Sequence, residues 1–184
     1  MVENFPIYKV LVVDDDEMIR RLLMTILSKH GQHCEEAKDG FEASDKMKKS
    51  HFDAVITDIE MPKMNGVVLT KMLLDEYPDL PIMVMTGFTR NHKIGTVIAA
   101  GARDFIKKPF SPAELIMRFK IMMRDQKIRS KTRAKGVMEP SDSIDPFQEK
   151  ISKLKMQINS FQNKSNFSYD SMDNKLSFTS SESP

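Results

Sequence analysis

Three short stretches of the chain, at residues 9–13, 53–57 and 81–85, are almost wholly apolar in their interiors. Apolar runs of this length without alternation are typical of strands covered on both faces of a parallel sheet. Two weaker stretches, 34–37 and 104–106, also have strand character, and the polar one at 34–37 fits a sheet edge. We therefore expect five strands.

Between these stretches, apolar residues recur three and four positions apart, which is the spacing of one helix face. The pattern predicts helices, and together with their start and stop signals it places them at about residues 19–30, 41–49, 66–76, 91–100 and from 112 onward. Five alternations of strand and helix predict an α/β fold, a doubly wound five-stranded parallel sheet with helices on both faces.

The composition narrows the class of protein. A length of 184 residues allows one domain with an appendage, and a net charge of +2 indicates no strong preference for polyanions. A single cysteine, Cys34, excludes an intramolecular disulfide framework and fits a reducing compartment. The N-terminus has no signal pattern and no apolar run is long enough to span a membrane, so we expect a cytoplasmic protein.

The last third of the chain differs in character from the rest. A basic run opens it, and we interpret residues 126–146 as a basic and polar linker after a domain at 7–125. Apolar residues then recur in a heptad-like pattern that predicts a short amphipathic helix at 147–162. Residues 163–184 are rich in serine and asparagine, and we expect disorder there.

Charged residues follow three of the predicted strands. Asp14 and Asp15 follow the first, Asp58 ends the third, and Lys108 follows the fifth. In an open α/β sheet the functional crevice lies at the carboxyl ends of the strands. Carboxylates at such short distances repel one another unless a cation lies between them. A set of oxygen ligands suits Mg²⁺, and the backbone carbonyl of Glu60 could add a further ligand.

This set of residues suggests a specific chemistry. A carboxylate such as Asp58 can act as a nucleophile and form an acyl phosphate. The metal and the Lys108 ammonium would neutralise the transferring phosphoryl group, and the Thr86 hydroxyl could reach the same oxygens. A lone acid after a strand is more often a helix cap, and we interpret Asp16 in that way.

Five short motifs carry a resemblance to a known family. They are VVDD at 12–15, TDIEMP at 57–62, NG at 65–66, MTG at 85–87 and KPF at 108–110. In this order and spacing they resemble the receiver domain of two-component response regulators, over roughly residues 7–125. The resemblance implies a flavodoxin-like fold with strand order 2-1-3-4-5.

The resemblance also implies residue roles. Asp58 would accept a phosphoryl group from a histidine kinase or a histidine phosphotransfer protein, and Asp14 and Asp15 would bind Mg²⁺. Thr86 and Lys108 would sense the phosphoryl group, and the Lys108–Pro109 peptide would be cis.

Phe105 would be the aromatic switch residue that turns inward as Thr86 moves. Phosphorylation would then reshape the face made by the fourth helix, fifth strand and fifth helix. Such a protein is a switch with self-phosphorylation and self-dephosphorylation chemistry, and is not otherwise an enzyme.

An enzymatic alternative stays open. A haloacid-dehalogenase-type phosphatase also has a strand-end Asp nucleophile and Mg²⁺, with a second acid two residues later, a spacing that Glu60 matches. Met61 and Pro62 do not fit that family, and the pair Asp14 and Asp15 has no role in it.

The output of the switch has three possible forms. The C-terminal extension could bind an unknown partner protein, the heptad-like stripe could form a homodimer, or the basic run could contact nucleic acid or an anionic membrane. We rank them in that order, since basic runs are usually solvated and a stripe under three heptads is marginal alone. The sequence does not identify the cognate kinase or the signal.

Overall fold

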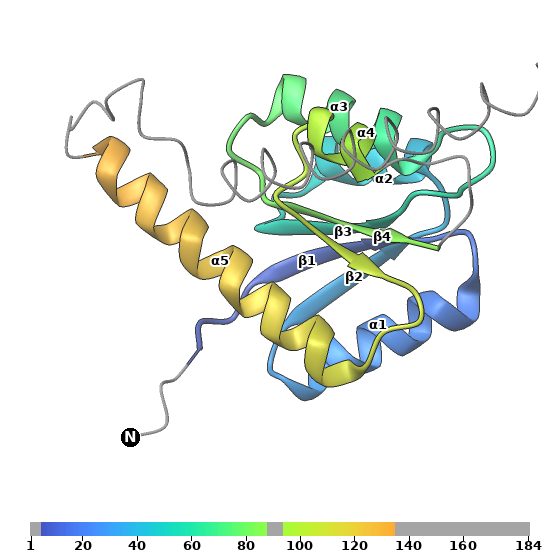
Figure 1. Cartoon of the computed structure of the whole chain (residues 1–184), viewed down its shortest axis with the longest axis horizontal. Helices are drawn as coiled ribbons and strands as arrows, with labels where there is room; N and C mark the ends of the chain where they lie inside the picture. The colour runs from blue at the N-terminus through green and yellow to red at the C-terminus, as the bar shows by residue number, and fades with distance from the viewer. Residues whose placement is uncertain (1–4, 88–93, 135–184) are drawn as a thin grey trace, which may run out of the picture. The chain divides into compact units, whose positions relative to one another are not determined.

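The computed structural model describes residues 5–87 and 94–134, which form five strands and five helices (Figure 1). The strands are β1 (Lys9–Val13), β2 (His33–Ala37), β3 (Ala54–Asp58), β4 (Ile82–Thr86) and β5 (Asp104–Lys107). The helices are α1 (Glu17–Lys29), α2 (Gly40–Lys49), α3 (Gly66–Glu76), α4 (Ile94–Ala99) and α5 (Pro112–Ala134).

All five strands are parallel and lie in the order β2-β1-β3-β4-β5. The predicted flavodoxin-like fold is therefore confirmed, with the polar strand β2 at an edge. In β1, β3 and β4 nearly every residue is buried, as expected for strands with a helix layer on each side. Because the strands are parallel, their carboxyl ends all lie along the same end of the sheet.

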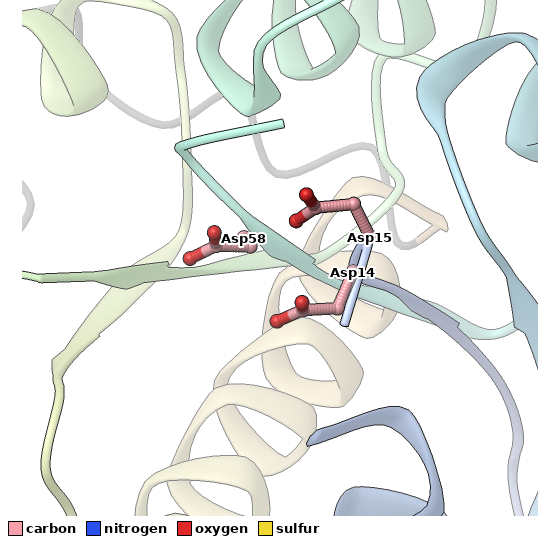
Figure 2. A group of neighbouring side chains, drawn as sticks. All are labelled: Asp14, Asp15 and Asp58. Atoms are coloured by element: carbon pink, nitrogen blue, oxygen red, sulfur yellow. The ribbon is translucent and has the colours of Figure 1, made fainter. Parts of the chain in front are cut away.

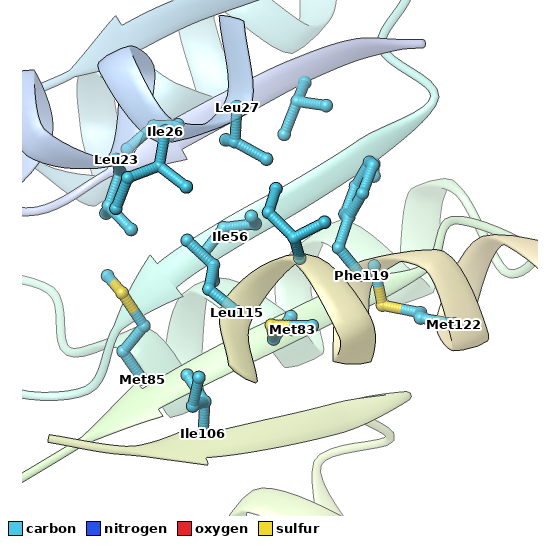
Figure 3. Close-up of a cluster of buried hydrophobic side chains, with 14 of the residues drawn as sticks. Leu23, Ile26, Leu27, Ile56, Met83, Met85, Ile106, Leu115, Phe119 and Met122 are labelled. Carbon is cyan, nitrogen blue, oxygen red and sulfur yellow. The ribbon is translucent and has the colours of Figure 1, made fainter. Parts of the chain in front are cut away.

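Two helix layers cover the sheet. Helices α1 and α5 lie on one face, and α2, α3 and α4 lie on the other (Figure 1). On the first face Leu23 and Leu27 from α1 and Leu115 and Phe119 from α5 pack against the strand residue Ile56 (Figure 3). A second buried cluster lies under α2, α3 and α4. Because helices pack on both faces of the sheet, the ends of the strands are held in place.

Short polar caps begin the helices that follow β1, β2 and β3. Asp16, Asp39 and Asn65 each accept a hydrogen bond from a backbone N–H of the first helical turn. The prediction that Asp16 is a helix cap is thus confirmed, and this residue is set apart from its neighbours Asp14 and Asp15.

The end of α5 corrects the predicted extent of the last helix. The sequence assigned residues from 126 onward to a linker, but α5 continues through this basic run to Ala134. Basic side chains interact favourably with the carboxyl end of a helix, and Arg133 also pairs with Asp79 at 2.7 and 2.8 Å. The predicted segments 147–162 and 163–184 lie outside the described residues, and the division into domains stays a prediction.

In the part of the chain that the structure describes, none of the helices is both long and apolar enough to cross a lipid bilayer.

Candidate functional site

The carboxylates of Asp14, Asp15 and Asp58 meet at the carboxyl ends of the strands. One oxygen from each lies within 4.8 Å of the others, and all three groups project to the same side (Figure 2). Asp14 is 1% exposed and Asp58 is 6% exposed, whereas Asp15 lies open to solvent. These three acids, two buried and one exposed, form a cluster that we name the acidic pocket.

Lys108 joins the two buried acids. Its Nζ lies 2.9 Å from Asp14 Oδ2 and 2.9 Å from Asp58 Oδ1. Burial alone lowers the pKa of Lys108, but the hydrogen bonds and charges of the two carboxylates outweigh it, so that the pKa is raised. The lysine therefore stays charged and offsets part of the repulsion between the acids.

The protonation of Asp58 reflects opposing effects. Burial raises the pKa of its carboxyl group, while the hydrogen bond and charge of Lys108 lower it and the charge of Asp14 raises it. The net direction is upward. A further positive charge in the pocket would favour the ionised carboxylate.

The backbone after β3 approaches the Asp58 main chain closely. The Gly66 N–H donates to Ile59 O at 2.9 Å, and the Glu60 N–H donates to Asp58 Oδ2 at 3.2 Å. A Cβ atom at Gly66 would lie 1.9 Å from the Asp58 carbonyl oxygen. The turn therefore requires glycine at position 66.

Thr86 and Phe105 lie on the neighbouring strands β4 and β5. Thr86 is buried, its hydroxyl donates to Gly87 O at 2.9 Å, and its own carbonyl accepts from the Lys108 N–H at 2.7 Å. Phe105 is half-buried against the core under α2, α3 and α4. Backbone pairing thus links Thr86 directly to Lys108.

The family model described as "Response regulator receiver domain" matches residues 10–120, which is more than half of the chain. The chain belongs to this family. The match covers β2 to β5, all of β1 except Lys9, and the four residues Asp14, Asp15, Asp58 and Lys108. Of the two readings of the acid cluster, the receiver domain is the one that the family match supports.

Proteins similar to the chain in sequence are also response regulators. The chain is 34% identical over 147 residues to the response regulator MprA of Mycobacterium ulcerans, covering 79% of this chain and 63% of that protein. It is 37% identical over 116 residues to MprA of a Mycobacterium species (strain KMS), covering 63% and 50%. The chain therefore spans between half and two thirds of the length of these relatives.

Solved structures of response regulators are also similar to the chain. The chemotaxis protein CheY4 of Vibrio cholerae is 34% identical, with a TM-score of 0.60, covering 64% of this chain and 99% of that one. The structure of NtrX from Brucella abortus in complex with ATP is 25% identical, with a TM-score of 0.67, covering 83% and 34%.

The acidic pocket of this receiver domain fits a divalent cation. Receiver domains bind Mg²⁺ at an acidic pocket, and the oxygens of Asp14, Asp15 and Asp58 are hard donors close enough to share one ion. The accessible side at Asp15 leaves room for water or substrate oxygens, which Mg²⁺ usually retains.

Sequence reasoning missed Arg20, which supports the acid pair. Its Nη1 donates to the carbonyls of Asp14 and Asp15 at 2.9 and 3.2 Å, and its Nε donates to Glu36 Oε2 at 3.0 Å. An arginine on the first turn of a helix is ordinary in sequence, so only the folded geometry reveals this role. The cis Lys108–Pro109 peptide, by contrast, was correctly expected.

Proposed function

We propose that this receiver domain accepts a phosphoryl group on Asp58 from the phosphohistidine of a sensor kinase or a phosphotransfer protein, in a Mg²⁺-dependent reaction. Membership in the family implies a sensor kinase as partner. The observation that carries the proposal is the cluster of three acids bridged by Lys108, in which Asp58 is the member that ends the central strand β3 and accepts from the Glu60 N–H.

In this proposal a carboxylate oxygen of Asp58 attacks the phosphorus atom of the donor. The new bond is a P–O bond to Asp58, and the P–N bond to the donor histidine breaks, with the electron pair leaving on the imidazole nitrogen. The product is an acyl phosphate, the expected result of a carboxylate nucleophile. Burial of Asp58 removes competing water from the attacking group, which is consistent with its 6% exposure.

Lys108 would stabilise the phosphoryl group after transfer. Its ammonium already lies 2.9 Å from Asp58 Oδ1, so a phosphoryl group on Asp58 would come within its reach. The carboxylates of Asp14, Asp15 and Asp58 and the backbone carbonyl of Glu60 would hold Mg²⁺, which supplies positive charge for the phosphoryl oxygens.

Thr86 and Phe105 would transmit the change. A phosphoryl oxygen would compete with Gly87 O for the Thr86 hydroxyl, and a shift of Thr86 would open space for Phe105 to turn inward. The face formed by α4, β5 and α5 would then differ between two states, whose balance the phosphoryl group shifts. Helix α5 carries exposed Met117 and Ile121, which a downstream protein partner could cover.

The experiment is intact-mass spectrometry of the full chain after incubation with acetyl phosphate and Mg²⁺. The wild-type protein should gain one phosphoryl group, and Asp58→Asn should gain none. Asp75→Asn, at an exposed position of α3, is the matched control and should behave as the wild type.

The same experiment without Mg²⁺ should give little or no product. A phosphoryl group on Asp58→Asn at the wild-type level would show that Asp58 is not the acceptor. Continuous release of phosphate from a simple phosphate ester would instead favour the phosphatase reading.

A further inference from the structure

A second concave site lies at the amino-terminal ends of the strands, at the other end of the sheet from the acidic pocket. It is a groove of about 740 Å³ between three segments: the connection from α2 to β3, the connection from α3 to β4, and the second half of α5. Its residues Tyr8, Asp53 and Pro81 precede β1, β3 and β4, so the groove opens where these strands begin. A volume of this size is typical of sites for small molecules.

The walls of this groove are apolar and partly aromatic. They include Tyr8, Phe52, Tyr77, Pro78, Leu80 and Met123. Tyr77 is fixed in place because its hydroxyl donates to Glu76 Oε1 at 3.0 Å. Such walls favour a ligand with a flat or bulky apolar body.

Gln126, on the α5 wall of the groove, carries an unsatisfied acceptor. Its Nε2 donates to the Asp79 carbonyl, but its buried Oε1 has no hydrogen-bond partner within the described part of the chain. A buried acceptor without a donor costs free energy, on the order of 1–3 kcal/mol. A ligand that brings an N–H group would remove this cost.

The charged residues of the groove favour a cation. Asp79 pairs with Arg133, and the Asp53 carboxylate accepts from the Lys9 N–H at 2.7 Å and lies 3.5 Å from His51 Nε2. With His51 neutral, the carboxylates of Asp53 and Glu76 still outnumber the ammonium of Lys127 among the lining residues. The groove is therefore rich in acceptors and negative in balance. An anion would meet two carboxylates, and a neutral apolar molecule would leave Gln126 Oε1 without a donor.

We propose that this groove binds a small organic cation with an apolar body, of the class of arylalkylamines. The aryl group would lie against the partly exposed side chains of Tyr77 and Leu80, and the ammonium would face Gln126 Oε1 and the two carboxylates. The proposal goes beyond phosphoryl transfer and does not depend on it, because the groove and the acidic pocket lie at opposite ends of the sheet. Such a site would let a small molecule act on the second half of α5.

The test is NMR titration of the ¹⁵N-labelled full chain with phenethylamine, in Mg²⁺ sufficient to keep the amine out of the acidic pocket. Two probes of nearly the same shape serve as comparisons: neutral 2-phenylethanol and anionic phenylacetate. Phenethylamine should give saturable shifts at Phe52, Tyr77 and Gln126. The alcohol should give weaker shifts and the acid none.

Two exposed charges of the groove provide variants with opposite expected effects. Glu76→Gln should weaken phenethylamine binding roughly two- to fivefold, and Lys127→Gln should strengthen it by a similar factor. A general disturbance of the fold would not change the affinity in opposite directions. Glu17→Gln and Lys71→Gln, which make the same charge changes outside the groove, should leave it unaltered.

Three results would overturn the proposal. They are equal shifts from the amine and the alcohol, which would reduce the groove to a general apolar surface; shifts at Asp14 and Asp58 alone; and no effect of either variant on affinity.

Discussion

At the scale of single residues, the acidic pocket depends on side chains that do not themselves belong to it. Arg20 holds the carbonyls of Asp14 and Asp15, and Gly66 lets the turn after β3 approach the main chain of Asp58. The acids are visible in the sequence because charges rarely end buried strands without a use. The roles of Arg20 and Gly66 cannot be predicted from the sequence, because a contact between residues far apart in the chain leaves no local sequence pattern.

Arg20→Lys should weaken Mg²⁺ binding about three- to tenfold. The substitution keeps the positive charge but loses the fork that holds two carbonyls and Glu36 at once, so the acid pair is less well positioned. Isothermal titration calorimetry measures the effect. Arg21→Lys is the control, since Arg21 is exposed on the same helix. Equal Mg²⁺ affinities of the two variants would show that Arg20 does not position the acid pair.

Gly66→Ala should destabilise the protein by about 1–3 kcal/mol, because the new methyl group would collide with the Asp58 carbonyl, which is backbone and cannot turn aside. Urea denaturation measures the change in the free energy of unfolding. Gly95→Ala is the matched control, because nothing lies within 4 Å of a Cβ at that helical position. A loss no larger than that of Gly95→Ala would contradict the close approach.

Cys34 should be slow to alkylate at pH 8. Burial raises the pKa of its thiol to about 11, so the reactive thiolate is scarcer in the folded protein than in the unfolded chain, where the thiol pKa is about 8.5. The rate of iodoacetamide labelling should keep rising up to about pH 11 and should level off near pH 9 in urea. A plateau near pH 9 in the folded protein would show an ordinary thiol.

At the scale of elements, apolar runs predicted the buried strands well because burial on both faces leaves an uninterrupted pattern. The strand at 9–13 and the helix at 66–76 have the predicted bounds. The end of α5 was missed, since the basic run at 127–133 has no apolar face that periodicity could detect. What supports these turns is a loop far away in sequence, where Asp79 accepts from both Gln126 and Arg133.

Asp79→Ala should therefore loosen the last turns of α5. Loss of the ion pair, in which Arg133 Nη1 contacts both carboxylate oxygens, should reduce the hydrogen-exchange protection of amides at 127–134 roughly two- to fivefold, with little change in global stability. Asp75→Ala removes an exposed acid from the preceding helix and should leave α5 unchanged. Equal protection in Asp79→Ala and the wild type would mean that the helix persists without this contact.

At the scale of the whole molecule, the parallel sheet separates two kinds of surface. The carboxyl ends of the strands gather the acids and Lys108, and the opposite ends form an apolar groove against α5. The motifs predicted the first surface, because each strand end contributes a residue of distinct chemistry. They gave no sign of the second, which is assembled from loops whose residues are individually unremarkable.

Chemical trapping of the phosphorylated side chain tests whether Asp58 is the phosphoryl acceptor. Borohydride reduces an acyl phosphate of aspartate to homoserine, which marks the acceptor by its mass in a peptide map. After incubation with acetyl phosphate and Mg²⁺, we expect homoserine at position 58 and unmodified Asp14 and Asp15. Homoserine at position 14 or 15, or a phosphorylated chain that yields none, would contradict this assignment.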